Sequence, residues 1–124
     1  MVLRCFGSIT TEFFMLIYHV TLPANWAKYQ DRPSYQTESL NTEGFIHCSY
    51  AGQLSGVLKR YYSNARKVII LTIETEKLRS KLIAETSTGG EAFPHIYGRL
   101  NHDAVVNVEE RDLRSATDSL SDFA

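Results

Sequence analysis

Apolar residues gather in short runs along the chain, and most of these runs are typical of β-strands. The runs at residues 15–22 and 44–49 are rich in β-branched and aromatic side chains, and a weaker run covers residues 81–86. Residues 67–74, KVIILTIE, form the strongest run, and their unbroken apolar sequence predicts a central strand buried on both faces. A last strand is predicted over residues 103–110.

Two segments have the pattern of short helices instead. Pro23 suits the first turn of a helix, and the following ANWAKYQ would place Trp26 and Tyr29 on one side. Farther along, apolar side chains recur at the spacing of one helical face, at Leu54, Val57, Leu58 and Tyr61.

The remaining segments are polar or rich in turn residues. Residues 31–43 and 90–101 are interpreted as ordered loops, the second because Pro94 and Gly98 interrupt its aromatic residues. Residues 1–14 lack a consistent period and are expected to pack poorly, and residues 111–124 are expected to form a flexible tail. The predicted helices lie early in the chain, and the later strands follow one another without regular alternation with helices. This order predicts a single α+β domain over residues 15–110.

Composition narrows the class of protein further. The 124 residues and 14.1 kDa suit one domain, and 44% hydrophobic with 22% charged residues exclude a disordered chain. A net charge of −1 argues against broad nucleic-acid or membrane-surface binding, which both need excess positive charge. The apolar run at residues 13–20 is far shorter than the roughly 20 residues of a membrane span. Cys5 and Cys48 form no CxxC pair, and we expect a reducing cytoplasm.

Three of the four histidines occupy similar positions and are the candidate site residues. His19, His47 and His95 each lie in or beside a strand-like segment and within two residues of a hydroxyl-bearing side chain. We expect them to converge on one concave surface, because strand ends expose functional groups. Its rim would be formed by Thr21, Ser49, Tyr97 and one of Glu85 or Glu91. The alternative is three separate core histidines, each with its own hydrogen-bond partner.

Two other kinds of chemistry are weaker candidates. A zinc site would need histidines at ligand spacing, but HxH, HExxH and HxxxH are all missing, so no metal is expected. A Cys48 nucleophile is disfavoured because adjacent strand residues point to opposite faces, which leaves His47 badly placed as its base. A buried structural thiol is the favoured interpretation of Cys48.

Three strings in this order carry a family resemblance: IYHVT, EGFIHCS followed by Gln53, and GGEAFPHIYGRLNHDAVV. The order closely resembles the bacterial family catalogued as domain of unknown function 952, from about Met15 to Val108. Members usually begin at or just before the first string, so residues 1–14 are expected to be an N-terminal extension, with Met15 as an alternative start. Arg99 stands where family members often have Pro.

The family's fold is similar to that of the ADP-ribosyltransferases, which implies a split β-sandwich with two or three short helices and a cleft for NAD. The first string resembles a motif whose His bonds the adenosine ribose, which points to His19 and Thr21. The second resembles one whose aromatic residue stacks on nicotinamide, which points to Phe45 or His47. Ser49, His95 and Tyr97 would complete the cleft. The chain departs from the first motif at Val20, where the enzymes have Gly.

The resemblance also implies a catalytic glutamate, with Glu91 the first candidate and Glu85 the second. Cleavage of the nicotinamide–ribose bond develops positive charge on the ribose, which a carboxylate stabilises. The leading hypothesis is therefore a cytoplasmic domain that binds NAD or a related nucleotide and transfers or hydrolyses ADP-ribose. The alternatives are a non-catalytic nucleotide-binding module and a metal-dependent hydrolase that uses His19, His47 and His95.

Overall fold

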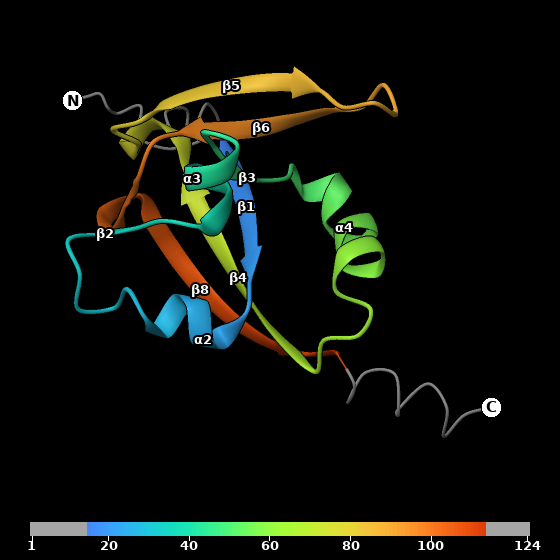
Figure 1. Cartoon of the computed structure of the whole chain (residues 1–124), viewed down its shortest axis with the longest axis horizontal. Helices are drawn as coiled ribbons and strands as arrows, with labels where there is room; N and C mark the ends of the chain where they lie inside the picture. The colour runs from blue at the N-terminus through green and yellow to red at the C-terminus, as the bar shows by residue number, and fades with distance from the viewer. Residues whose placement is uncertain (1–14, 114–124) are drawn as a thin grey trace, which may run out of the picture.

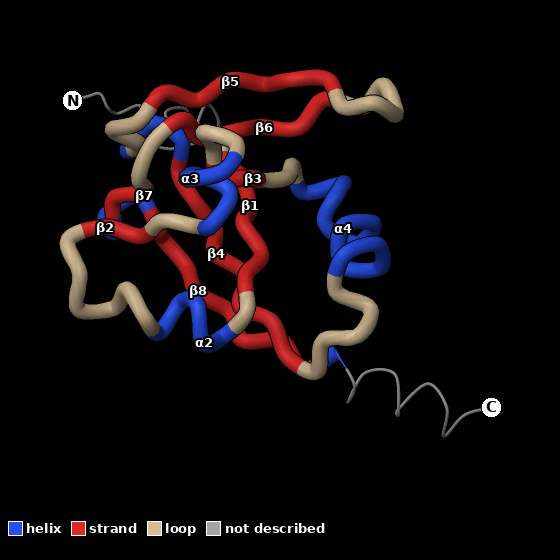
Figure 2. Tube along the Cα trace, in the orientation of Figure 1, coloured by secondary structure: helices blue, strands red, loops and turns tan. Residues whose placement is uncertain are grey.

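The computed structural model describes residues 15–113, and within them the fold is α+β, as predicted (Figures 1 and 2). Two three-stranded sheets and one two-stranded sheet are joined by short helices. The predictions made for residues 1–14 and 114–124 lie outside the described residues.

The first sheet has the strand order β1-β4-β8 and is antiparallel throughout. Its strands are β1 (Leu16–Thr21), β4 (Lys67–Glu74) and β8 (Val105–Asp112). The central position predicted for the VIILTI segment is confirmed, because β4 pairs on both sides and Val68, Ile70 and Leu71 are almost fully buried. The last strand runs to Asp112, past the expected boundary at residue 110.

The second sheet has the strand order β3-β6-β5 and crosses the first steeply in Figure 1. Its strands are β3 (Ile46–His47), β5 (Lys81–Thr86) and β6 (Ala92–Tyr97). Beyond β3 the chain pairs with β1, because Tyr18 and Ser49 exchange backbone hydrogen bonds of 2.7 and 2.8 Å. This bridge joins the edges of the two sheets and fixes β3 beside β1.

Short elements complete the domain. The two-stranded sheet pairs β2 (Ser34–Tyr35) with β7 (Leu100–Asn101). The α-helices are α2 (Pro23–Ala27), α3 (Glu38–Thr42) and α4 (Leu54–Tyr61). The 3₁₀ turns are η1 (Ala51–Gln53), η2 (Thr75–Lys77) and η3 (His102–Ala104).

Both faces of β4 are covered, each by a separate apolar cluster. The larger cluster lies between the two sheets and includes Ile17, Leu71, Ile46 and Ile96. The smaller cluster lies under α4, where Leu54, Val57 and Leu58 pack near Val20, Val68 and Ile70. The helix was predicted to present Tyr61 to the core as well. Tyr61 is instead exposed and Tyr62 packs there, because the helix ends at Tyr61 and the backbone turns at the following residue.

The prediction of a loop over residues 31–43 is wrong, because this segment contains β2 and α3. The Thr37 hydroxyl caps α3 by accepting a hydrogen bond from the Leu40 N–H, and Glu38 lies in the first turn, where a carboxylate is favoured. Gly44 closes the helix with φ of +93°, and its N–H reaches the carbonyl groups of Ser39 and Leu40.

The prediction of a loop over residues 90–101 is also wrong, because β6 occupies Ala92–Tyr97 and is the middle strand of its sheet. Pro94 suggested a loop, since proline cannot donate to a ladder. It is tolerated here because the ladder to β3 covers only Ile96 and His95 and ends before Pro94. The prolyl carbonyl still accepts from the Cys48 N–H, at 3.0 Å.

Candidate functional site

Four rings meet on the outer face of the β3-β6-β5 sheet, the face opposite to the main core. Strand alternation buries Ile46 and Ile96 and turns their neighbours outward. We call the four outward rings the ring cluster, which consists of Phe45, His47, His95 and Tyr97.

The Phe45 ring lies at the centre of this cluster. It stacks on His95 with centroids 4.0 Å apart, and it contacts His47 and Tyr97 at 4.8 and 5.3 Å. The His47 and His95 rings lie 5.3 Å apart at a steep angle, because the two residues are register partners on β3 and β6. The sheet thus brings together two residues that are 48 positions apart in the sequence.

Glu85 on β5 joins the ring cluster through one carboxylate oxygen. Its Oε1 accepts a hydrogen bond from His95 Nδ1 at 2.7 Å and another from the Tyr97 hydroxyl at 2.5 Å. These bonds, first that of Tyr97 and then that of His95, lower the pKa of Glu85 and keep it ionised. The Glu85 bond in turn raises the pKa of Tyr97. Within residues 15–113, Glu85 Oε2 and His95 Nε2 have no hydrogen-bond partner.

His47 has a carboxylate partner of its own. Its Nε2 lies 3.2 Å from both carboxylate oxygens of Glu43, which directly follows α3. The cluster therefore contains two imidazoles, each oriented by a glutamate, with the His47 side chain 55% exposed and the His95 side chain 14% exposed. Sequence reasoning missed Glu43, although its spacing of four residues from His47 was a usable signal.

His19 does not reach this surface. It lies on β1 in the main core and is 5% exposed. Its Nδ1 donates to the His47 carbonyl at 2.6 Å, so Nε2 is the acceptor for the Tyr35 hydroxyl, at 2.9 Å. Burial lowers the pKa of His19 to about 4, which keeps the ring neutral. The structure thus supports the alternative of a satisfied core histidine at this position.

The expected rim is only partly present. The structure brings His47, His95, Tyr97 and Glu85 together, but Thr21 and Ser49 are each 4% exposed and lie inside the domain. Cys48 is buried as expected, and burial raises the pKa of its thiol, which disfavours a nucleophile.

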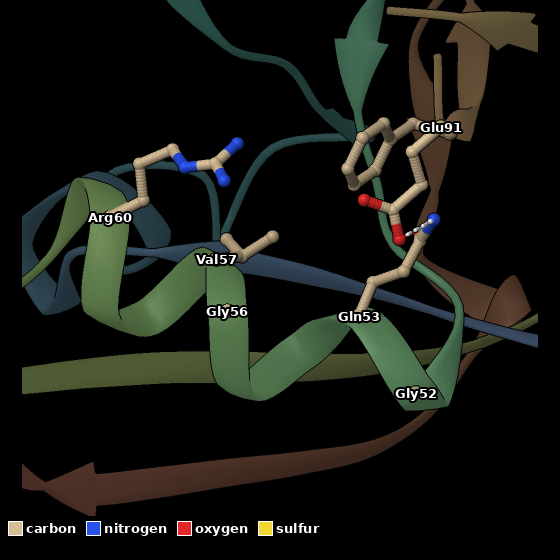
Figure 3. A pocket seen from close by; sticks show the side chains of 7 residues that line it. Gly52, Gln53, Gly56, Val57, Arg60 and Glu91 are labelled. Carbon is tan, nitrogen blue, oxygen red and sulfur yellow. Dashed lines mark hydrogen bonds between the residues drawn. The ribbon is translucent and has the colours of Figure 1, made fainter. Parts of the chain in front are cut away.

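Glu91 lies apart from the Glu85 network, in a small hollow between α4 and the β5–β6 hairpin (Figure 3). Its Oε2 accepts a hydrogen bond of 3.1 Å from the side-chain amide of Gln53. Arg60 on α4 also lines this hollow. Neither Gln53 nor Arg60 was a candidate in the sequence, because residues of a helix and a hairpin so distant in the chain share no local pattern.

Comparison with known proteins identifies the family. The chain belongs to the family described as protein of unknown function (DUF952), which matches residues 20–108. The crystal structure of protein CC0527 from Caulobacter crescentus is similar, with 28% sequence identity and a TM-score of 0.73 over 80% of this chain and 88% of that chain. Its solution NMR structure gives 28% identity and a TM-score of 0.69 over 79% and 85%. No curated protein matches the sequence.

The described residues also lack two kinds of feature, a metal-binding group and a membrane-spanning helix. Among residues 15–113, no group of three or more His, Cys, Asp or Glu side chains is placed to hold a metal ion. No helix in the described part of the chain is long and apolar enough to cross a membrane.

Proposed function

We propose that the ring cluster binds NAD or a related ADP-ribose nucleotide, and that Glu85 serves the cleavage of its glycosidic bond to ribose. The observation that carries this proposal is the Glu85 carboxylate, which is fixed through Oε1 by His95 and Tyr97 and leaves Oε2 without a partner in the described chain. An ionised oxygen in that state can accept a hydrogen bond from a ribose hydroxyl.

The rings supply the complementary part of a nucleotide site. Phe45 and the two imidazoles offer aromatic surface, and a flat base or nicotinamide ring stacks favourably on such surfaces. In neutral rings whose other nitrogen donates to a glutamate, His47 Nδ1 and His95 Nε2 are acceptors available to hydroxyl groups such as those of a ribose.

The reaction on NAD would be a substitution at the ribose carbon that carries nicotinamide. The carbon–nitrogen bond breaks, its electron pair leaves with neutral nicotinamide, and positive charge develops on the ribose. Water or another nucleophile then bonds to that carbon and loses a proton. The Glu85 carboxylate would stabilise the developing charge, as a fixed negative group does best in a preorganised site.

The proposal includes a split β-sandwich of the ADP-ribosyltransferase type. Two sheets joined at their edges by the Tyr18–Ser49 bridge support this comparison. In that arrangement His19 would act indirectly, because its ring is buried and bonded to the His47 carbonyl. Glu85 replaces Glu91 as the first candidate for the catalytic carboxylate.

Thermal shift and calorimetry with NAD, ADP-ribose, AMP and nicotinamide test the binding. Wild type should bind NAD and ADP-ribose, and Phe45→Ala and His95→Ala should each weaken binding about tenfold or more. Equal binding by wild type and both variants would rule out the ring cluster as the site.

Nicotinamide release, measured by chromatography, distinguishes an enzyme from a non-catalytic module. Glu85→Gln should retain nucleotide binding and lose nicotinamide release, because the amide has the shape of the carboxylate without its charge. Glu76→Gln, on the exposed η2 turn, is the matched control and should behave as wild type. If the wild type binds NAD but releases no nicotinamide, the protein is a non-catalytic nucleotide-binding module.

A further inference from the structure

The hollow between α4 and the β5–β6 hairpin is separate from the ring cluster in its lining (Figure 3). Its volume is about 120 Å³, which is small beside the roughly 300–1,000 Å³ of drug-sized ligand pockets. It can therefore take a small molecule or one group, and not a dinucleotide. The lining includes Arg60, Glu91, Val57 and Phe93, with Gly52 and Gly56 along the helical side.

Two opposite charges line this hollow without neutralising each other. Arg60 and Glu91 form no ion pair with one another, and neither has an ion-pair partner elsewhere in residues 15–113. In Figure 3 they lie on opposite sides, with Val57 between them. Charged side chains of both signs are thus available at two separate positions of one small hollow.

The negative side is fixed by the protein. The amide of Gln53 donates to Glu91 Oε2 at 3.1 Å and to the Ala92 carbonyl at 2.7 Å. The other end of the same amide accepts from the Tyr50 N–H at 2.9 Å. All three bonds hold the Gln53 side chain between η1 and the hairpin, so the carboxylate of Glu91 is oriented before any ligand binds.

Two apolar side chains also line the hollow. Phe93 and Val57 supply this hydrocarbon surface. At Gly52 and Gly56 the neighbouring residues leave the space of an added Cβ open to 4 Å. The absence of side chains at these two positions therefore keeps the helical side of the hollow open.

We propose that this hollow binds a small zwitterion, such as an amino acid, whose acid and amino groups are separated by a short hydrocarbon segment. The acid group would pair with Arg60, the ammonium group with Glu91, and the hydrocarbon segment would lie on Phe93 and Val57. A simple anion is disfavoured because Glu91 would repel it, and a simple cation is disfavoured because Arg60 would repel it. The proposal uses no residue of the ring cluster, so its failure leaves the nucleotide proposal standing.

A series of amino acids can measure the spacing that the hollow accepts. Glycine, β-alanine, 4-aminobutyrate and 5-aminopentanoate carry the same two charges at increasing separation and serve as the probes. NMR titration of the full chain should show shifts at Gly52, Gly56 and Glu91, with affinity that peaks at one chain length. Butyrate and butylamine, which each lack one charge, should bind about tenfold or more weakly than the best probe.

Variants assign the two ends of the ligand. Arg60→Gln and Glu91→Gln should each lower affinity for the best probe about tenfold or more, because each removes one charged partner. Lys59→Gln, on the same helix but outside the hollow, should bind as wild type does. Gly56→Leu should also abolish binding by filling the hollow, while the thermal unfolding profile confirms that this variant folds.

Three results would overturn the proposal. One is that no probe shifts the resonances of the hollow at any concentration tested. Another is that butyrate binds as tightly as 4-aminobutyrate, which would make this a simple anion site. The third is that affinity is unchanged in Glu91→Gln, which would leave the negative side of the hollow without a role.

Discussion

The imidazole of His95 lies flat on the phenyl ring of Phe45, with ring centroids 4.0 Å apart and ring planes inclined by 16°. The contact depends on a helix that is remote from His95 in the sequence. Ser39 in α3 donates its hydroxyl to the Phe45 carbonyl at 2.8 Å, which fixes the chain just before β3. Phe45 is thereby held over the middle strand, where its ring and Glu85 together orient His95.

Replacement of Phe45 by Ala should release one side of His95. The variant loses a stacked aromatic pair and half-buried apolar surface, so the free energy of unfolding should fall by about 1–2 kcal/mol. The His95 ring protons should move downfield in the NMR spectrum, because they leave the shielding region of the phenyl ring. Phe45→Tyr retains the aromatic ring and should preserve both the shift and the stability. An unchanged His95 spectrum in Phe45→Ala would contradict the stacked arrangement.

The central strand offers a direct test of core packing. Ile70 on β4 is 2% exposed and packs under α4, so Ile70→Ala should lower the free energy of unfolding by about 2–5 kcal/mol through lost burial and the cavity left behind. Val108→Ala, at a position that is 47% exposed on β8, should cost about 0.5 kcal/mol or less. Urea denaturation measures both values. Similar costs at the two positions would mean that β4 is not the centre of the core.

The local pattern of apolar residues was sufficient to predict elements with a strong apolar signal, such as strand β4 and helix α4. The apolar run of residues 67–74 predicted its central place, and the helical spacing of Leu54, Val57 and Leu58 predicted the face that α4 buries. The apolar pattern failed to predict the polar helix α3, which is defined by the residues at its two ends. Residues 38–42 have little apolar content, and Thr37 and Gly44 at the two termini are what define α3.

The residues of the candidate site were likewise predicted only in part from the sequence. Sequence reasoning selected His47, His95, Tyr97 and Glu85, since these residues lie on or beside strand-like strings. It could not decide which histidine faces outward, because that choice depends on which side of each sheet meets the other sheet. His19 faces the partner sheet and is buried, and His95 faces away from it.

Gly98, which follows β6, has a backbone conformation that other residues adopt only with strain. Its φ is +148°, and an added Cβ would lie 2.9 Å from the Cβ of Ser80. Gly98→Ala should therefore lower the free energy of unfolding by about 2–4 kcal/mol, from backbone strain together with the clash.

Two variants separate these causes in thermal or urea unfolding. Ser80→Gly in the Gly98→Ala background removes the clash and should recover only part of the stability, because the φ strain stays. Gly89→Ala is the control, since its added Cβ would contact only the Ser87 hydroxyl at 3.9 Å and its φ is not positive. A stability loss at Gly98 no larger than that at Gly89 would show that the turn accepts a side chain.

His19 should make the stability of the domain depend on pH. Its pKa is lowered by burial to about 4 in the folded chain, against an ordinary value of 6.5. Between these two values the unfolded chain binds a proton that the folded chain does not, so unfolding is favoured as the pH falls. The loss of stability is absent above about pH 6.5 and grows as the pH falls, and it reaches roughly 3 kcal/mol at about pH 4.

Replacement of His19 by Gln isolates this contribution from those of the other titrating groups. The difference in unfolding free energy between wild type and His19→Gln, measured by urea denaturation from pH 4 to pH 8, should narrow as the pH falls below 6.5. Glutamine can still donate to the His47 carbonyl and accept from Tyr35, but it does not titrate. In the wild-type NMR spectrum, the His19 ring should show no protonation step near pH 6.5. A step at that pH, or a difference that stays constant with pH, would mean that the ring is accessible to solvent and free to reach the surface with His47 and His95.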